Sequence, residues 1–361
     1  MNREKYLKSA KRIVIKIGSA LITDGKRIFT DFLENLAFQV YELQTQKKEI
    51  IIVSSGAVAC GIYKLKLKRT PHNIFEKQAL SAIGQPYLMS IYQKFFEKYN
   101  IICSQILITY QDIANPKSFY LASKTIDYLL KFKTLPIVNE NDTVSIEELS
   151  IGDNDNLSAH IAVLSNADIL IILTSASGVY DKDPNTYKDA KLIREIKDIS
   201  KELENINCQT KTKLGTGGMK VKLEAALKAA YKGIPTLIVS GKEEKSILKA
   251  LKGDIGTFVY PKKKLSKKLY HMLYLHPPKG KVFIDLGAKD AILKGKSLLP
   301  KGIKYFSGSF EKGDVIEIFD ETNRYLGKGI AKYSSKDLEN TLKNLPRKTR
   351  CFIHRNEMII L

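Results

Sequence analysis

Apolar runs alternate with helical patterns along the first two-thirds of the chain. Strands are predicted where these runs are rich in β-branched residues, at 12–18, 49–56, 101–109, 134–141, 167–175 and 234–241. Several runs are apolar on both faces, which is typical of parallel strands covered by helices on both sides. Helices are predicted at 78–98 and 218–232. The pattern predicts an α/β domain at 1–257, a three-layer αβα sandwich with a mostly parallel sheet.

The composition and sequence pattern of the chain change after residue 257. Residues 261–268, "PKKKLSKK", hold five lysines and predict a basic linker at 258–279. From residue 280 onward, short strand-like runs are separated by glycines, as in "KVFIDLGA", "GDVIEIF", "GKGIAKY" and "CFIHR". This spacing predicts a second, small and mostly β domain at 280–361.

The chain is strongly basic. Its 361 residues include 59 Lys and Arg against 38 Asp and Glu, a formal charge of +21. Such an excess favours anionic partners such as nucleotides, nucleic acid or acidic metabolites. Lysines spread over solvated surfaces would give the same total, so composition alone leaves both interpretations open.

Cysteine usage and the N-terminus indicate a reduced, cytoplasmic protein. The cysteines are far apart and lack the spacing of a zinc site: Cys60, Cys103, Cys208 and Cys351. The N-terminal segment is charged and has no uninterrupted apolar core, unlike a signal peptide. No apolar run approaches the roughly 20 residues of a membrane span, so no membrane partner is predicted.

Residues 152–156 read "GDNDN", which packs four polar side chains together. A calcium loop counted from Asp153 would need oxygen ligands where Leu157 and Leu164 stand, so the EF-hand spacing fails. Asn156 or Asp155 can cap a helix predicted at 157–166. One residue is enough for a cap, so the surplus of polar groups indicates a binding role.

Common nucleotide and metal motifs are missing from the sequence. No G-K pair completes a Walker A motif, and no G-x-G-x-x-G follows a predicted strand. H-E-x-x-H is also absent. These absences argue against a P-loop, a dinucleotide fold and a zinc protease.

Polar residues gather instead where predicted strands end. These clusters are Lys16, Gly18 and Ser19; Ser54, Ser55 and Gly56; Asn139, Glu140, Asn141 and Asp142; and Thr174 and Ser175. A glycine loop, "LGTGGMKVK", opens the helix at 218–232. Each cluster alone is more often a turn or a solvated surface. Together they predict one site for an anionic ligand, beyond the carboxyl ends of the strands and at a helix N-terminus.

The motifs resemble the amino acid kinase family. "VIKIGSALIT", "VSSGAVACG", "VNENDTVS", "IGDNDNLSA" and "GTGGMKVKLEAA" occur in the family's order. "GKSLLPKGI", "GSFEKGDVI" and "GIAKYSS" resemble the PUA domain fused to bacterial members that phosphorylate glutamate. The resemblance covers nearly the whole chain. It implies the amino acid kinase fold followed by a PUA domain.

The resemblance also implies a reaction. ATP would phosphorylate the side-chain carboxylate of L-glutamate, the first step of proline biosynthesis, with Mg²⁺ on the phosphates and few protein ligands for the metal. Proline as a feedback inhibitor and a homo-oligomeric assembly are further implied. A carboxylate with a pKa near 4.3 is already an anionic nucleophile at neutral pH. Catalysis is therefore expected to consist of positioning and charge neutralisation, without a general base.

Residue roles follow from the same resemblance. Lys16 and Lys222 would flank the transferring phosphoryl group, and Asp155 would hold both lysines. The implied glutamate-binding residues are Ser55, Asp142, Asn154 and Asp153, which leaves Asn156 as the helix cap. Gly18, Gly56 and residues 216–218 would supply N–H donors. The implied ATP-binding residues are Lys16, Gly18, Thr174, Ser175, Thr216, Gly217, Gly218, Met219, Lys220, Val221 and Lys222.

Two positions depart from the family pattern. Ser175 stands where the family commonly has Asp, so one carboxylate on the nucleotide side is missing. Ala20 follows Ser19 where a second hydroxyl residue is common.

Two rival functions remain open at this point. Related kinases act on N-acetylglutamate, aspartate or a nucleoside monophosphate, but an acetylated substrate would leave Asp142 and Asp153 without a cationic amine to bind. An RNA-binding role is the other rival, because PUA domains occur in RNA-modifying enzymes. Against the RNA-binding role, the basic run at 261–268 lacks interleaved aromatic residues.

Overall fold

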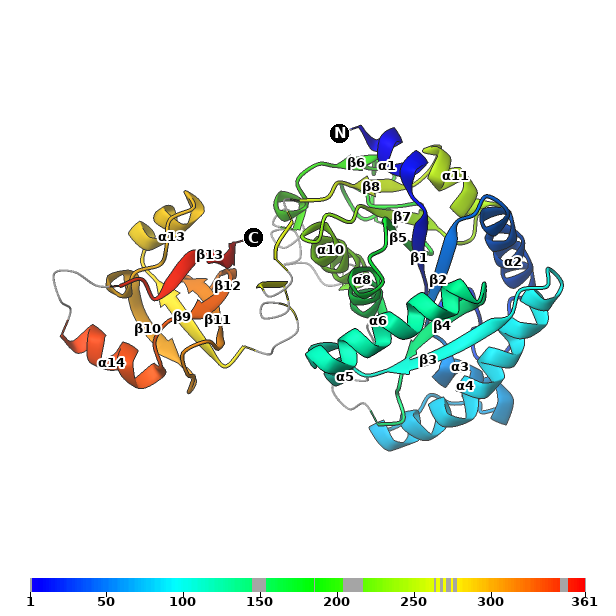
Figure 1. Cartoon of the computed structure of the whole chain (residues 1–361), viewed down its shortest axis with the longest axis horizontal. Coiled ribbons are helices and arrows are strands. Elements are labelled where there is room, and N and C mark those ends of the chain that lie inside the picture. The colour runs from blue at the N-terminus through cyan, green and yellow to red at the C-terminus, as the bar shows by residue number, and fades with distance from the viewer. Residues whose placement is uncertain are drawn as a thin grey trace. The chain divides into compact units, whose positions relative to one another are not determined.

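A computed structural model gives the fold of the chain. It describes residues 2–144, 154–184, 186–203, 217–262, 264–266, 269–270, 274, 278–344 and 350–360. The chain divides into two compact units, Met1–Lys264 and Leu265–Leu361. Each unit is built around a β-sheet of its own (Figure 1).

The first unit holds an eight-stranded sheet with the order β3-β4-β2-β1-β5-β7-β8-β6. The strands are β1 Arg12–Ile17, β2 Glu49–Ser54, β3 Cys103–Ile108, β4 Leu135–Glu140, β5 Ile169–Thr174, β6 Glu195–Ile196, β7 Thr236–Ser240 and β8 Thr257–Val259. All pairings are parallel except β7 with β8. The six strands predicted from apolar runs are confirmed. The short strands β6 and β8 were not predicted.

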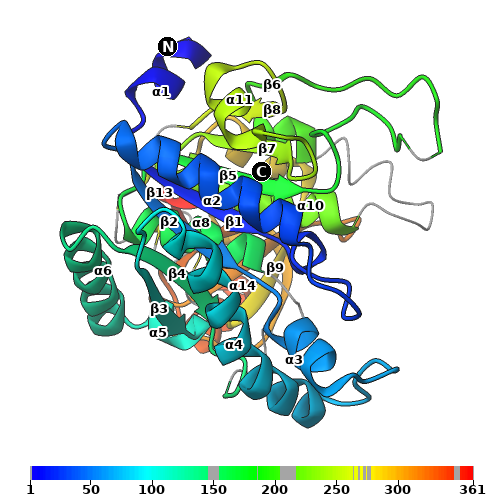
Figure 2. The same ribbon diagram turned by 90° about the vertical axis from the view of Figure 1, so that its right-hand side faces the viewer.

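Helices cover both faces of this sheet. They are α1 Arg3–Ser9, α2 Thr30–Thr45, α3 Ala57–Leu65, α4 Ile74–Glu97, α5 Tyr110–Ala114, α6 Pro116–Lys131, α8 Asn154–Leu164, α10 Gly217–Ala230 and α11 Ser246–Lys252. Figures 1 and 2 show α2, α4 and α11 on one side of the sheet, with α6, α8 and α10 on the other. The predicted three-layer fold is confirmed. In the described part of the chain, no helix is both long and apolar enough to cross a membrane.

Strand β1 lies at the centre of the sheet and serves both layers. Ile13, Ile15 and Ile17 belong to the apolar core shared with α2 and α4. Side chains alternate along a strand, so Lys16 points to the opposite face, where α8 packs on β1. The strand thereby places the buried side chain of Lys16 near the carboxyl end of β1.

Helices α3 and α4 pack through two glycines at very close range. A Cβ added at Gly61 would lie 2.1 Å from the carbonyl oxygen of Leu80. A Cβ added at Gly84 would lie 1.8 Å from the carbonyl oxygen of Ala57 and 2.4 Å from the nitrogen of Gly61. Both contacts involve backbone atoms, which cannot rotate away, so this helix pair requires glycine at both positions.

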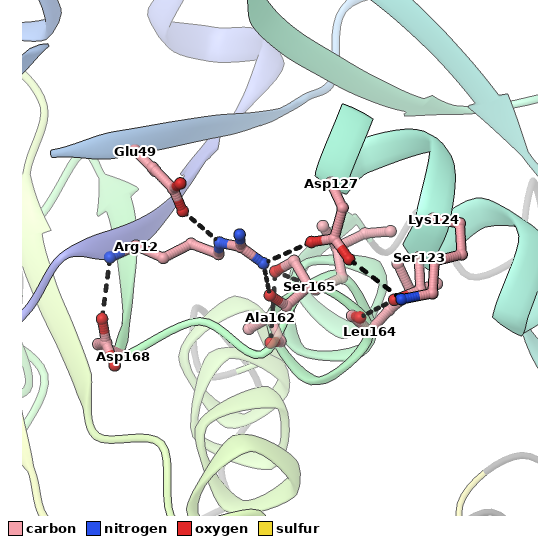
Figure 3. Close-up of polar contacts among 10 residues, drawn as sticks. Arg12, Glu49, Ser123, Lys124, Asp127, Ala162, Leu164, Ser165 and Asp168 are labelled. Carbon is pink, nitrogen blue, oxygen red and sulfur yellow. Dashed lines mark hydrogen bonds and ion pairs between the residues drawn. The ribbon is translucent and has the colours of Figure 1, made fainter. Parts of the chain in front are cut away.

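A polar cluster at the amino end of the strands fastens α8 (Figure 3). The Arg12 guanidinium lies 2.6 Å from Glu49 and 2.9 Å from Asp127, and it donates to the carbonyl oxygen of Ser165 just after α8. Burial alone lowers the pKa of Arg12, but hydrogen bonds and charge from Glu49 and Asp127 outweigh burial and raise it. Asp168 accepts the backbone N–H of Arg12 at 2.9 Å. The carboxyl end of α8 is thus tied to β1, β2 and α6.

The second unit is a small, mostly β fold, as predicted. Its five strands have the order β10-β9-β11-β12-β13. They are β9 Gly280–Ile284, β10 Ile303–Ser307, β11 Val315–Asp320, β12 Tyr325–Ala331 and β13 Ile353–Ile360, with helices α13 Leu286–Leu293 and α14 Ser335–Lys343. Tyr270 and Tyr274, in the expected linker, are buried with ring centroids 5.1 Å apart. Lys328 Nζ of β12 lies 5.1 Å from the centroid of the Tyr274 ring, so this tyrosine packs inside the second unit, next to its sheet.

Asp320 closes the turn between β11 and β12. Its carboxylate accepts from Lys289 Nζ at 2.7 Å, from Thr322 Oγ1 at 2.6 Å and from the Arg324 N–H at 3.0 Å. Burial on its own raises the pKa of Asp320. The hydrogen bonds from Lys289, Thr322 and Arg324 outweigh burial and hold the pKa well below its usual range.

Replacing Asp320 by Asn is expected to destabilise the second unit at pH 7 by about 2 kcal/mol, because a charged hydrogen-bonding partner is lost. A depressed carboxyl pKa stabilises the fold above the unfolded pKa of about 3.9, and that stability is lost as pH falls further. The difference in unfolding free energy between wild type and variant should therefore become smaller below about pH 4. Urea unfolding at pH 7 and pH 3.5 measures this. Glu321→Gln, at an exposed pair with Lys304, is the control and should change stability little.

Candidate active site

Two lysines meet one carboxylate at the centre of the site. Lys16 Nζ of β1 lies 2.6 Å from Asp155 Oδ1, and Lys222 Nζ of α10 lies 3.0 Å from Asp155 Oδ2. Asp155 stands in the first turn of α8. The structure therefore brings together the three residues predicted to be catalytic, from three separate elements.

This cluster carries a positive charge in a largely buried place. Lys16 and Asp155 are only 7% and 5% exposed, and Lys222 is half-buried. One carboxylate between two ammonium groups leaves an excess of one positive charge. Coulomb attraction is stronger where water is excluded, so this place favours an anionic ligand. Each oxygen of Asp155 contacts one lysine, which fixes both cations relative to each other.

Asn154 sits beside this cluster and contacts the end of β2. Its Nδ2 lies 3.0 Å from the carbonyl oxygen of Ser54, 2.8 Å from Ser55 Oγ and 3.0 Å from Asn139 Oδ1. Two residues predicted to bind glutamate, Ser55 and Asn154, are thus in direct contact. Asn154 is 8% exposed, and its Oδ1 has no hydrogen-bond partner among the described residues.

Asp142 follows β4, and a side chain of α4 hydrogen-bonds to its carboxylate. Its Oδ2 accepts from Ser81 Oγ at 2.8 Å. It is half-buried, so part of the side chain stays accessible. Asp153, the remaining residue predicted to bind glutamate, lies outside the described residues.

Glycine turns follow both β1 and β2. Gly56 has φ of +113° and immediately precedes α3, a conformation that only glycine adopts readily. Gly18 precedes a short 3-10 helix, and a Cβ added there would lie 3.7 Å from Lys16 Nζ. The turns are joined, because the Ser55 N–H donates to the Ile17 carbonyl oxygen at 3.0 Å. Backbone groups therefore line the edge of the sheet next to Lys16.

Besides Lys16 and Gly18, the described residues predicted to bind ATP lie at the end of β5 and in α10. Thr174 ends β5 next to β1, and Ser175 follows it at the surface. The first turns of α10 contain Gly217, Gly218, Met219, Lys220, Val221 and Lys222. Lys222 Nζ also donates to the Gly218 carbonyl oxygen at 3.1 Å. Thr216 lies outside the described residues.

The predicted helix cap is wrong. Helix α8 begins at Asn154, so Asn156 and Asp155 lie inside its first turn. Asn156 Oδ1 instead accepts from Lys228 Nζ of α10. The prediction started the helix at the first apolar residue, Leu157, although the polar residues before it are already helical.

Sequence reasoning missed the residues that support the site from α4. Gln85 Oε1 accepts from Asn139 Nδ2 at 2.8 Å, and Ser81 holds Asp142. Both are polar residues four positions apart in an otherwise apolar stretch, "ALSAIGQPYL". That spacing places them on one face of the helix and is the signal that could have revealed them.

No protein cage for a metal ion is built among the described residues, where no group of three or more His, Cys, Asp or Glu side chains is arranged to bind one. Mg²⁺ that enters with a nucleotide needs only one or two protein ligands, because phosphate oxygens and water complete its shell. A nucleotide-bound Mg²⁺ would therefore not require such a group of side chains.

The sheet, the helices and the paired lysines define the class of protein. The sequence profile of the amino acid kinase family matches residues 11–240, and that of the PUA domain matches residues 280–351. The chain belongs to the amino acid kinase family.

Among individual proteins, the chain is similar to glutamate 5-kinases. That of Thermoanaerobacter sp. (strain X514) is 41% identical over 332 residues, covering 91% of this chain and 89% of the relative. That of Dictyoglomus thermophilum is 40% identical over 370 residues, covering 97% of this chain and 98% of the relative. Carbamate kinase from Giardia lamblia, solved with AMP-PNP, shares the fold at TM-score 0.52 and 17% identity, covering 70% of this chain and 99% of that one.

Proposed function

We propose that the protein transfers the terminal phosphoryl group of ATP to the side-chain carboxylate of L-glutamate. The products are L-glutamate 5-phosphate and ADP, and the step opens proline biosynthesis. The observation that carries the proposal is Asp155, which holds Lys16 and Lys222 beside Ser55 and Asn154. The glutamate 5-kinase relatives, which cover about nine-tenths of the chain, support the same reaction.

The reaction needs no general base from this protein. The glutamate side chain has a pKa near 4.3 in water and is ionised at neutral pH. Each oxygen of Asp155 contacts a lysine ammonium, so this carboxylate serves to hold the two lysines. The obstacle is electrostatic repulsion between an anionic nucleophile and an anionic nucleotide.

Lys16 and Lys222 would lower this repulsion. Two ammonium groups fixed by one carboxylate offer positive charge where negative charge develops on the transferring group, without reorganising during the reaction. Mg²⁺, when bound to the phosphates, would supply further charge neutralisation. The first turn of α10 adds backbone N–H groups at a helix N-terminus, which favours phosphate there.

Substrate choice would depend on the other half of the site. Glutamate carries an α-ammonium group, and Asp142 and the Oδ1 of Asn154 are acceptors suited to it. An N-acetylated amino acid carries no such cation for Asp142 to bind. This difference favours glutamate over N-acetylglutamate.

ADP release with a panel of acceptors tests the proposal. The panel contains L-glutamate, N-acetyl-L-glutamate, L-aspartate and UMP, each with ATP and Mg²⁺. We expect L-glutamate to give the highest kcat/KM, with an acid-labile acyl phosphate as product. A higher kcat/KM for N-acetylglutamate or UMP would overturn the assignment.

Replacing Asp142 by Asn or Asn154 by Ala is expected to raise the KM for glutamate. Each change removes a hydrogen bond to a charged group, which corresponds to roughly a ten- to hundredfold loss of affinity. The KM for ATP should change much less, because the nucleotide would lie on the Thr174 side. Steady-state kinetics with each substrate varied, together with thermal melts, tests this. Equal rises in both KM values with a lowered Tm would mean that the two residues only brace loops.

We further propose that residues 280–361 are separable from catalysis. A chain ending at Lys264 keeps β8 and the bond from the Lys262 N–H to the Ala230 carbonyl oxygen at 2.9 Å. It should fold and phosphorylate glutamate with a kcat within about threefold of the full chain, because no described catalytic residue is lost. Circular dichroism and the ADP assay check this. A folded but inactive truncated protein would contradict it.

The family resemblance supports three further proposals. The enzyme would work in the cytoplasm, assemble as a homo-oligomer and be inhibited by proline. Proline resembles glutamate in its α-amino and α-carboxylate groups, so inhibition should weaken as glutamate concentration rises. Initial rates over a grid of both amino acids would test for this competition, and light scattering would give the molecular mass in solution.

A further inference from the structure

Helix α4 directs two buried polar side chains toward the amino-acid side of the site. Ser81 and Gln85 are 2% and 6% exposed and lie four positions apart, so they share one face of the helix. Ser81 Oγ donates to Asp142 at 2.8 Å, and Gln85 accepts from Asn139 at 2.8 Å. Burying polar groups is unfavourable unless they are hydrogen-bonded. Here each one bonds a residue at the end of β4.

The direction of the Gln85 contact is fixed by the backbone. The Glu140 N–H can only donate, so the Asn139 atom 2.8 Å away must be the oxygen, Oδ1. The Asn139 nitrogen therefore faces Gln85, whose facing atom must be the acceptor Oε1. Gln85 Nε2 is left to donate to Gln105 Oε1 of β3, 3.1 Å away. The amides of Asn139, Gln85 and Gln105 therefore form a chain of hydrogen bonds that can run in only one direction.

The orientation of the Asn154 amide is fixed in the same way. The Ser54 carbonyl oxygen can only accept, so the Asn154 atom 3.0 Å away must be Nδ2. Asn139 Oδ1 also accepts from this nitrogen at 3.0 Å. Asn154 Oδ1 is consequently turned away from β2 and β4, buried and without a hydrogen-bond partner among the described residues. A buried acceptor of this kind requires a donor, and a cationic amine supplies one.

We propose that Ser81 and Gln85 are positioning residues that set the amino-acid side of the site to select a free α-ammonium group. Gln85 acts through Asn139 and keeps the oxygen of Asn154 directed at the substrate. Ser81 fixes the carboxylate of Asp142. This inference rests on the proposed function and identifies what selects a free amine among acidic substrates.

Loss of the Gln85 acceptor should disturb Asn139 first. In Gln85→Met the Asn139 nitrogen would be buried without an acceptor, which is unfavourable. The Glu140 N–H and Asn154 Nδ2 still need the Asn139 oxygen, so the Asn139 amide would shift rather than turn over. That shift would move Asn154 with it and displace the oxygen that should bind the ammonium group.

The test compares glutamate with glutarate, which has both carboxylates and no amine. Gln85→Met should raise the glutamate KM about tenfold, the effect of one hydrogen bond to a charged group. The Ki of glutarate as a competitive inhibitor and the KM for ATP should stay within about twofold, because neither contacts the amine-binding acceptors. Ser81→Ala, a smaller change that preserves folding, should raise the glutamate KM about threefold with the same selectivity.

Two further variants complete the design. Gln85→Glu keeps an acceptor for Asn139 and should hold the glutamate KM within about threefold of wild type. Gln93 lies on the same helix and accepts from the Cys103 N–H at 3.0 Å, without contact to the amide chain. Gln93→Met therefore controls for loss of a helix-to-β3 hydrogen bond, and its kinetics should match wild type.

The outcomes separate this inference from the proposed function. A wild-type enzyme that does not phosphorylate glutamate would remove the proposed function itself. With activity present, unchanged glutamate KM values in both Gln85→Met and Ser81→Ala would overturn the positioning role. Parallel rises in glutamate KM, glutarate Ki and ATP KM would also overturn it, since that result indicates general damage to the fold.

Discussion

Replacing Lys16 or Lys222 by alanine is expected to lower kcat about a hundredfold or more. Each lysine is bound to one oxygen of Asp155, at 2.6 Å and 3.0 Å. Removing either takes away a positive charge opposite the charge that develops on the phosphoryl group. It also leaves Asp155 with one cation instead of two, so the remaining electrostatic field is less favourable to an anion.

Steady-state kinetics at saturating glutamate and ATP measures this effect. Lys249→Ala serves as the control, because Lys249 of α11 pairs with Glu243 at 2.8 Å and both side chains are partly exposed. It removes the same charge and should leave kcat within about twofold, as expected for a partly exposed pair outside the catalytic cluster. Near-wild-type turnover in Lys16→Ala or Lys222→Ala would exclude that lysine from the reaction.

Replacing Gly84 by alanine is expected to destabilise the first unit by about 3 kcal/mol or more, at the upper end for overpacked cores. The added methyl group would lie 1.8 Å from the Ala57 carbonyl oxygen. Backbone atoms of α3 would have to move apart from α4 to admit it. Since α3 starts directly after Gly56, at the edge of the site, activity should fall together with stability.

Urea unfolding followed by circular dichroism tests the Gly84 prediction. Gly287→Ala is the matched control, because it also places a methyl group on a helical glycine. Its added Cβ would come no closer than 3.4 Å to Asp285, an ordinary contact, and alanine favours a helix by about 1 kcal/mol over glycine. A Gly84→Ala protein as stable as wild type would show that α3 and α4 can separate without cost.

The sheet could be predicted because its central strands carry a strong signal. β1, β2, β5 and β7 are buried on both faces, so nearly every position is apolar and β-branched. The site followed from the same strands, because in a parallel sheet their polar ends gather at one edge. Lys16, Ser55 and Thr174 were located by that rule. The strand β6 has two residues, too few to produce any periodic pattern.

The support behind the site could not be predicted in the same way. Gln85 and Asn139 are distant in sequence, and nothing in either segment alone shows that their amides meet. The start of α8 was misplaced for a related reason. Asn154 and Asp155 are polar but buried, since their partners Ser55, Lys16 and Lys222 come from other elements. Tertiary contacts outweigh the local pattern where a helix begins inside a binding site.

The order of strands in the sheet has a consequence for synthesis on the ribosome. Strands β1 to β4 all arise from residues 12–140 and lie side by side as β3-β4-β2-β1. Once residue 142 has been added, the chain already contains Ser55, Asn139, Asp142 and the face of α4 that supports them. Thr174 and Lys222 are added only when β5 and α10 emerge, because domains grow from the N-terminus during translation. A nascent chain is therefore expected to shape part of the amino-acid side well before it gains the means to transfer phosphate.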